Sequence, residues 1–92
     1  FAGTRVIVTG GARGIGGRIA ERFGQEGAHV AILDRMADAG RAHAECIGAR
    51  FIETDLADND DARRAMREAI DRLSGVDVLV NNAGMLRCAS VL

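Results

Sequence analysis

Three glycines in the stretch TGGARGIGG have a spacing that would let backbone amides surround a phosphate. Gly10, Gly14 and Gly16 follow an apolar run at residues 4–9 and precede a segment with helical periodicity. A strand, a glycine-rich turn and a helix start together expose free amides, and such amides bind pyrophosphate. The loop alone is weak evidence, because glycine is also the ordinary solution for a sharp turn that binds nothing.

Asp34 adds a second feature in register with the first. It follows a second apolar run at residues 28–33 and lies about twenty residues beyond Gly14. A dinucleotide-binding fold places an acid at this position, where it accepts hydrogen bonds from the adenosine ribose hydroxyls. The loop and the acid together indicate a dinucleotide site, although no frame of the loop matches G-x-G-x-x-G.

Strand-like and helix-like segments must position these residues, and they alternate along the whole chain. Short apolar runs at residues 4–9, 28–33, 50–54 and 76–80 have the composition of buried parallel strands. Helical spacing predicts a helix that ends near Gly27, a weaker one at about 37–47 and a clear one at about 60–73. The alternation predicts an α/β fold, a Rossmann-type doubly wound parallel sheet of strand order 3-2-1-4 in three α/β/α layers.

Composition excludes several classes of function. The net charge of −1, with acids and bases interspersed, argues against nucleic acid or an anionic membrane surface as a partner. No apolar run reaches the roughly 18 residues of a membrane span. Cys46 and Cys88 match no metal-ligand spacing, so we expect reduced thiols in a cytoplasmic protein and no metal site.

Four motifs in order resemble the signatures of a known family. TGGARGIG at residues 9–16 is followed by Asp34, by Asp55 and Leu56 after the third apolar run, and by NNAG at residues 81–84. This series resembles the short-chain dehydrogenase/reductase family over nearly the whole chain. The resemblance implies an NAD(P)-dependent oxidoreductase that transfers hydride between nicotinamide and an alcohol or carbonyl substrate.

The resemblance also implies a role for each residue around the dinucleotide. Gly10 would make the tight turn, Gly14 would let the backbone approach the pyrophosphate, and Gly16 would let the helix pack on the strand. Asp55 would reach the adenine amino group, and Asn82 would border the nicotinamide ribose and tie the fourth strand to its neighbours. The implied cofactor-binding residues are Gly10, Arg13, Gly14, Ile15, Gly16, Asp34, Arg35, Asp55, Leu56, Asn82, Ala83 and Gly84.

Asp34 favours NAD as the cofactor. Its carboxylate can accept hydrogen bonds from both ribose hydroxyls, whereas a 2′-phosphate would lie against it as a like charge. Arg35 and Arg13 could each reach a 2′-phosphate, so NADP stays possible.

The implied chemistry needs residues that the chain does not contain. The family uses a Ser and a Tyr-x-x-x-Lys unit, in which the Lys lowers the phenol pKa from about 10 toward working pH. The sequence has no Tyr, and all twelve of its basic residues are Arg. We therefore expect no catalytic residue here, and we expect residues 1–92 to be the N-terminal part of a single domain of roughly 250 residues whose catalytic C-terminal part is absent.

Two other functions could use a sheet and a glycine loop of this kind. One is a dinucleotide-binding or sensor module without catalysis. The other is a methyltransferase on a similar sheet, which has no use for NNAG and is disfavoured. For the oxidoreductase we expect a homo-oligomer, and we expect the apolar strand at residues 76–80 to be an exposed edge in this chain alone.

Overall fold

The computed structural model describes residues 2–82 and confirms the alternation of strands and helices. The elements are β1 (Arg5–Thr9), α1 (Gly14–Gln25), β2 (His29–Asp34), α2 (Ala37–Ile47), β3 (Arg50–Glu53), α3 (Asn59–Leu73) and β4 (Val78–Asn81). Strand β4 begins two residues later than the apolar run predicts. Asp77, just before the strand, bonds to Arg5 with both its backbone and its side chain.

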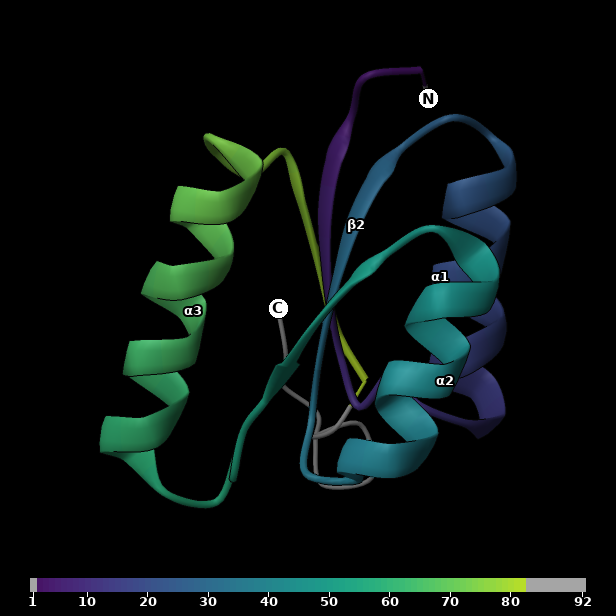
Figure 1. Cartoon of the computed structure of the whole chain (residues 1–92). Coiled ribbons are helices and arrows are strands. Elements are labelled where there is room, and N and C mark those ends of the chain that lie inside the picture. Colours follow the sequence, from purple (N-terminus) through teal and green to yellow (C-terminus); the bar gives the residue numbers. More distant parts are fainter. Residues whose placement is uncertain (1, 83–92) are drawn as a thin grey trace.

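The four strands form one parallel sheet in the predicted order β3-β2-β1-β4. Helices α1 and α2 cover one face of the sheet and α3 covers the other, which gives the three predicted layers (Figure 1). The carboxyl ends of all four strands meet at one edge, at the bottom of Figure 1, where Thr9 is in register with both Leu33 and Asn81. The order reverses at β1, since the chain moves from β1 to β3 on one side and then crosses to β4 on the other.

Each face of the sheet has its own apolar core. Under α3 the cluster comprises Ile7, Ala31, Leu33, Ile52, Ala65, Ala69 and Leu73. Under α1 and α2 it comprises Val6, Val8, Val30, Ile32, Ala20 and Ala44. The strands are apolar on both faces because both faces are covered, as parallel sheets require.

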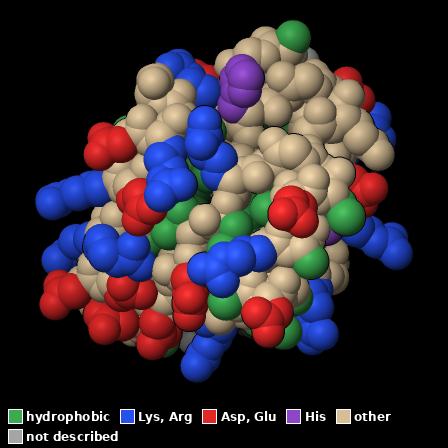
Figure 2. All heavy atoms as spheres, in the orientation of Figure 1, with side chains coloured by type: hydrophobic (Ala, Val, Ile, Leu, Met, Phe, Trp, Pro, Cys, Tyr) green, Lys and Arg blue, Asp and Glu red, His purple; other side chains and the backbone are tan. Residues whose placement is uncertain are grey.

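The outer face of α3 is charged. Figure 2 shows interspersed Arg and acidic side chains over this side of the molecule, at the left. Its ion pairs are Arg63–Asp60, Arg64–Asp61, Arg64–Glu68 and Arg72–Glu68, all spaced three or four residues apart on the helix. Asp58 caps the helix by accepting hydrogen bonds from the amides of Asp60 and Asp61.

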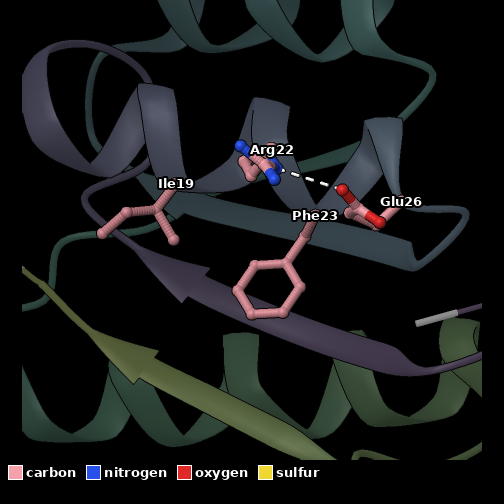
Figure 3. Close-up of a pocket in the computed structure, with 4 residues that line it drawn as sticks. All are labelled: Ile19, Arg22, Phe23 and Glu26. Carbon is pink, nitrogen blue, oxygen red and sulfur yellow. Dashed lines mark hydrogen bonds and ion pairs between the residues drawn. The ribbon is translucent and has the colours of Figure 1, made fainter.

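The β4 side of the sheet is the least covered. Within residues 2–82, β4 pairs with β1 alone, and Leu79 is 48% exposed. Ile19 and Phe23 point from α1 toward the strands beside a hollow of about 440 Å³ that Arg22 and Glu26 also line (Figure 3). The exposed edge expected from the sequence is therefore present among the described residues, while the homo-oligomer stays a prediction.

Arg5 and Asp77 join the start of β1 to the segment that enters β4. The backbone amide and Nε of Arg5 donate to Asp77 Oδ2 at 2.8 and 3.0 Å, and Nη2 donates to Oδ1 at 3.1 Å. Nη1 donates to the carbonyl of Ser74 at 2.6 Å. The side-chain bonds from Arg5, with its backbone amide second, lower the pKa of Asp77 to about 2.

This contact predicts an acid-dependent loss of stability. Because the carboxyl of Asp77 has a lower pKa in the folded chain, about 2 against 3.8, its stabilising effect is complete above about pH 4 and disappears between about pH 4 and pH 2. We expect Asp77→Asn to lower the melting temperature at pH 6 and to have little effect at pH 2.

The control is Asp71→Asn, since the Asp71 side chain is exposed and makes no ion pair within the described part of the chain. Thermal melts at both pH values should show the wild-type pH dependence for Asp71→Asn. An equal deficit at pH 6 and pH 2 for Asp77→Asn would show that the Arg5–Asp77 contact does not cause the pH dependence.

Candidate functional site

The expected site residues converge at the carboxyl edge of the sheet. A hollow of about 190 Å³ lies there, lined by Gly10, Asp34, Arg35, Thr54, Asp55, Leu56 and Ala57. These residues lie at or just after the carboxyl ends of three different strands, β1, β2 and β3. In open α/β sheets ligands bind outside the carboxyl ends of the strands, where the strand order reverses, and the hollow adjoins this point.

The glycine loop after β1 requires residues without side chains. Gly10 and Gly14 have φ values of +69° and +60°, a region that favours glycine. A Cβ on Gly16 would collide with the carbonyl oxygen of Gly10 and lie 2.6 Å from Nδ2 of Asn82. A Cβ on Gly14 would meet no atom within 4 Å. The loop is therefore tight on its inner side at Gly16 and open on its outer side at Gly14.

The N-terminus of α1 has no partner from its own side chains. Its N-cap residue, Arg13, makes no side-chain capping bond, and no acid lies in the first turn. Helix α3 differs, since Asp58 caps it and Asp60 and Asp61 occupy its first turn. The unsatisfied amides and positive dipole end of α1 suit an anion, and pyrophosphate fits this requirement.

Asp34 links the glycine loop to the turn after β2. Its side chain is buried, with 9% exposure. Oδ2 accepts a hydrogen bond from the amide of Ala12 at 3.1 Å, and Oδ1 accepts one from the amide of Met36 at 3.0 Å. Each carboxylate oxygen keeps a further acceptor position. Asp34 can therefore hold the loop and still accept bonds from hydroxyl groups.

Asp55 lies in a turn between β3 and α3. Its Oδ1 accepts a hydrogen bond from the amide of Ala57 at 3.1 Å, and its own amide donates to Asp61 Oδ2 at 2.7 Å. Thr54, which precedes it, is buried and donates from its backbone amide to the carbonyl of Asp34 at 2.9 Å. The turn is thus fixed both to β2 and to the first turn of α3.

Asn82 joins the end of β4 to the glycine loop. Its Nδ2 donates to the carbonyl of Gly10 at 3.1 Å. The preceding residue, Asn81, lies in β4, and its Oδ1 accepts a hydrogen bond from the hydroxyl of Thr9 at 3.2 Å. Ala83 and Gly84, also expected at the site, lie outside the described residues.

The other expected residues lie around the hollow at different depths. Arg35 lines it with an exposed side chain, and Leu56 lines it half-buried. Arg13 and Ile15 are exposed at the start of α1, with Ile15 66% exposed, and neither lines the hollow. Sequence reasoning missed Ala12, Thr54 and Ala57, because they take part through backbone atoms and position.

The sequence predicts neither a metal site nor a membrane span, and the structure bears on both only within the residues it describes. Among residues 2–82 no three His, Cys, Asp or Glu side chains gather as metal ligands. The helices of that same stretch include none with the length and apolar character needed to cross a membrane. Cys46 is a free, exposed thiol, and Cys88 lies outside the described residues.

Comparison with known proteins decides the family. The sequence profile described as short chain dehydrogenase matches residues 4–91. The chain belongs to the short-chain dehydrogenase family. It is 44% identical over 85 residues to an L-fucose dehydrogenase of Oryctolagus cuniculus, covering 91% of this chain and 30% of that protein. It is 41% identical over 92 residues to a sorbitol dehydrogenase of Cereibacter sphaeroides, covering 98% and 36%.

Solved structures of the family share the fold. A short chain dehydrogenase from Burkholderia cenocepacia in complex with NADP is 40% identical with a TM-score of 0.85, covering 98% of this chain and 39% of that one. A 3-ketoacyl-(acyl-carrier-protein) reductase from Brucella melitensis complexed with NADH is 30% identical with a TM-score of 0.81, covering 85% and 33%. The chain thus spans about a third of the length of these relatives.

Two neighbouring glycines of this chain predict opposite responses to alanine. Gly16→Ala forces the new Cβ onto the Gly10 carbonyl, and we expect a loss of about 1–3 kcal/mol in the free energy of unfolding from overpacking. Gly17→Ala is the matched control. Its Cβ would have no neighbour closer than 3.5 Å, and alanine favours the helix by up to about 1 kcal/mol. Urea unfolding measures both, and equal stabilities for the two variants would contradict the tight contact at Gly16.

Proposed function

We propose that this chain is the N-terminal, dinucleotide-binding part of a single Rossmann domain in an NAD(P)-dependent oxidoreductase. The observation that carries the proposal is the junction of the glycine loop with Asp34. The amide of Ala12, inside the loop, donates to Asp34 Oδ2 at 3.1 Å, next to the uncapped start of α1. An anion-binding helix end and a hydroxyl-binding carboxylate thus lie side by side, as a nucleoside diphosphate requires.

The residues present fit the adenosine diphosphate half of a dinucleotide. The amides at the start of α1, between Arg13 and Gly16, would bind the pyrophosphate, with Ile15 beside it. Asp34 would accept hydrogen bonds from the ribose hydroxyls, and the adenine would enter the hollow that Leu56 lines.

The nicotinamide half would lie toward the end of β4. Asn82 is held there by its bond to the Gly10 carbonyl, and Ala83 and Gly84 follow it in the sequence. The nicotinamide, when bound, gives or takes the hydride. The role of this chain is to hold the dinucleotide at the edge of the sheet where a substrate can meet it.

The proposed reaction is hydride transfer to a carbonyl carbon or from an alcohol carbon. Support comes from relatives named L-fucose dehydrogenase and sorbitol dehydrogenase, whose names specify hydroxyl-bearing substrates. These names do not favour a non-catalytic module. Because the chain has no Tyr and no Lys, the proton donor or acceptor would come from a C-terminal part of the complete protein.

Asp34 predicts a preference for NAD over NADP. A 2′-phosphate would face a buried carboxylate, so we expect the complete protein to bind NAD at least about tenfold more tightly. Asp34→Ala should weaken NAD binding and bring the dissociation constants of NAD and NADP closer together. The reason is that Arg35 and Arg13 could then attract the 2′-phosphate without repulsion from the Asp34 carboxylate.

Asp38→Ala is the control for this preference, since it removes an exposed carboxylate from the first turn of α2, four residues after Asp34. It should leave the ratio of the two dissociation constants unchanged. Calorimetric titration of both dinucleotides into all three proteins gives these ratios. Tighter binding of NADP by the unmutated protein would contradict the proposed role of Asp34.

Catalysis should require more than these 92 residues. Without a positioned proton donor or acceptor the reaction loses typically 10²- to 10⁴-fold in rate, so the 92-residue chain alone should show no measurable change in NADH absorbance with simple alcohols or ketones. The complete protein should show turnover with a suitable alcohol or carbonyl substrate. Sustained turnover by the purified 92-residue chain would contradict the proposed division between binding and catalysis.

A further inference from the structure

A network of side chains outside the hollow holds the turn that carries Asp55. Its central residue is Arg64, on the second turn of α3. Arg64 Nε donates to Asp61 Oδ1 at 2.8 Å, and Asp61 Oδ2 accepts from the backbone amide of Asp55 at 2.7 Å. Arg64 Nη2 also donates to the carbonyl of Glu53 at 2.9 Å, at the end of β3. The Arg64 guanidinium therefore connects α3 directly to Glu53 and, through Asp61, to Asp55. These two residues are the ends of the short segment that leads into the hollow.

The third nitrogen of the same guanidinium also makes a hydrogen bond. Arg64 Nη1 donates to Glu68 Oε1 at 3.0 Å, one helical turn further along α3. A single exposed ion pair contributes little to stability, and Arg64 is 49% exposed. Three directed bonds from one planar fork, however, fix geometry more strictly than a point charge does. The network is therefore suited to set the direction of the turn at Asp55.

Electrostatics supports this arrangement. The hydrogen bond from Arg64, followed by the one from the Asp55 amide, holds the pKa of the Asp61 carboxyl below its usual range. Asp61 thus stays charged and keeps accepting on both oxygens at neutral pH. A second hollow, of about 450 Å³ and lined by Arg35, Glu53, Thr54, Asp55, Asp61 and Arg64, shares the wall formed by Arg35, Thr54 and Asp55 with the first.

We propose that Arg64, acting through Asp61, is a positioning residue that aims the Asp55 carboxylate at the amino group of an adenine in the smaller hollow. This inference rests on the proposed function, since it assumes an adenine dinucleotide at that place. Asp55 Oδ1 already accepts from Ala57, and within residues 2–82 Oδ2 has no hydrogen-bond partner. Oδ2 is therefore the oxygen available to the adenine.

The test compares two dinucleotides that differ only at the purine. NAD carries the 6-amino group, and nicotinamide hypoxanthine dinucleotide carries an oxygen in its place. A hydrogen bond from the amino group to a charged carboxylate corresponds to about tenfold in affinity. In the complete protein we expect NAD to bind about tenfold more tightly than the hypoxanthine analogue, as measured by calorimetric titration.

Arg64→Met removes the guanidinium and keeps most of the side-chain stem. We expect the ratio of the two dissociation constants to fall toward one, through weaker NAD binding with nearly unchanged binding of the analogue, and we expect the same of Asp55→Ala. Asp61→Ala should give the same result, and it decides the question if Arg64→Met fails to fold. The matched control is Arg63→Met, because Arg63 is exposed and its ion pair with Asp60, at 3.7 Å, does not touch the turn.

The binding results distinguish failure of the proposed role of Arg64 from failure of the proposed function. Equal losses for both dinucleotides in Arg64→Met would show a general structural role and overturn the inference. An unchanged ratio in both Arg64→Met and Asp61→Ala would also overturn it, while leaving the proposed function intact. Failure of the unmutated protein to bind either dinucleotide would overturn the proposed function and this inference with it.

Discussion

The close approach of α1 to the loop after β1 is the constraint on which the site depends. It is possible because residue 16 is a glycine, since any Cβ there would meet the Gly10 carbonyl. That carbonyl also accepts the bond from Asn82, and Ala12 in the same loop donates to Asp34. Packing at one glycine therefore places the helix start, the end of β4 and the end of β2 within contact of a single loop.

Two of the helix starts at this edge of the sheet, those of α1 and α3, differ in how their first amides are satisfied. Helix α3 satisfies its own first amides with Asp58 and adds acids to its first turn. Helix α1, whose N-cap residue is Arg13, has neither feature. The positive end of the α3 dipole is thus neutralised within the protein, while that of α1 is left for a ligand. In the proposed function the start of α1 would bind the pyrophosphate, while α3 anchors the turn beside the hollow through the bond between Asp61 and the Asp55 amide.

Coverage of the sheet by helices and neighbouring strands is uneven among the described residues. Around β1 and β2 both faces are packed against helices, and the core residues there are fully buried. At β4 the outer edge is unpaired within the described residues, and Leu79 is half exposed although it is in register with the buried Ile7. The relatives are about three times as long as the aligned region. The proposed C-terminal part of the domain would be the natural cover for this edge.

The sequence by itself determined the fold and the outline of the site. Apolar runs separated by helical periodicity required a parallel sheet, and the glycine spacing with Asp34 indicated where a dinucleotide would bind, because these signals depend on local backbone geometry and residue spacing. The helix at 37–47 was predicted with the bounds that the structure gives it. The strand β4 begins two residues after the start of the apolar run, and that run cannot reveal that Asp77 is held by Arg5, 72 residues away.

Only the tertiary structure decided which groups hold the site residues in place. The bonds of Asp34 to the amides of Ala12 and Met36 leave no trace in the sequence, because a backbone amide is present at every residue except proline. The link from Arg64 through Asp61 to Asp55 is hidden for another reason. On a helix, an Arg three residues after an Asp reads as an ordinary surface pair. Its further contact with the Glu53 carbonyl arises only when α3 packs across the end of β3.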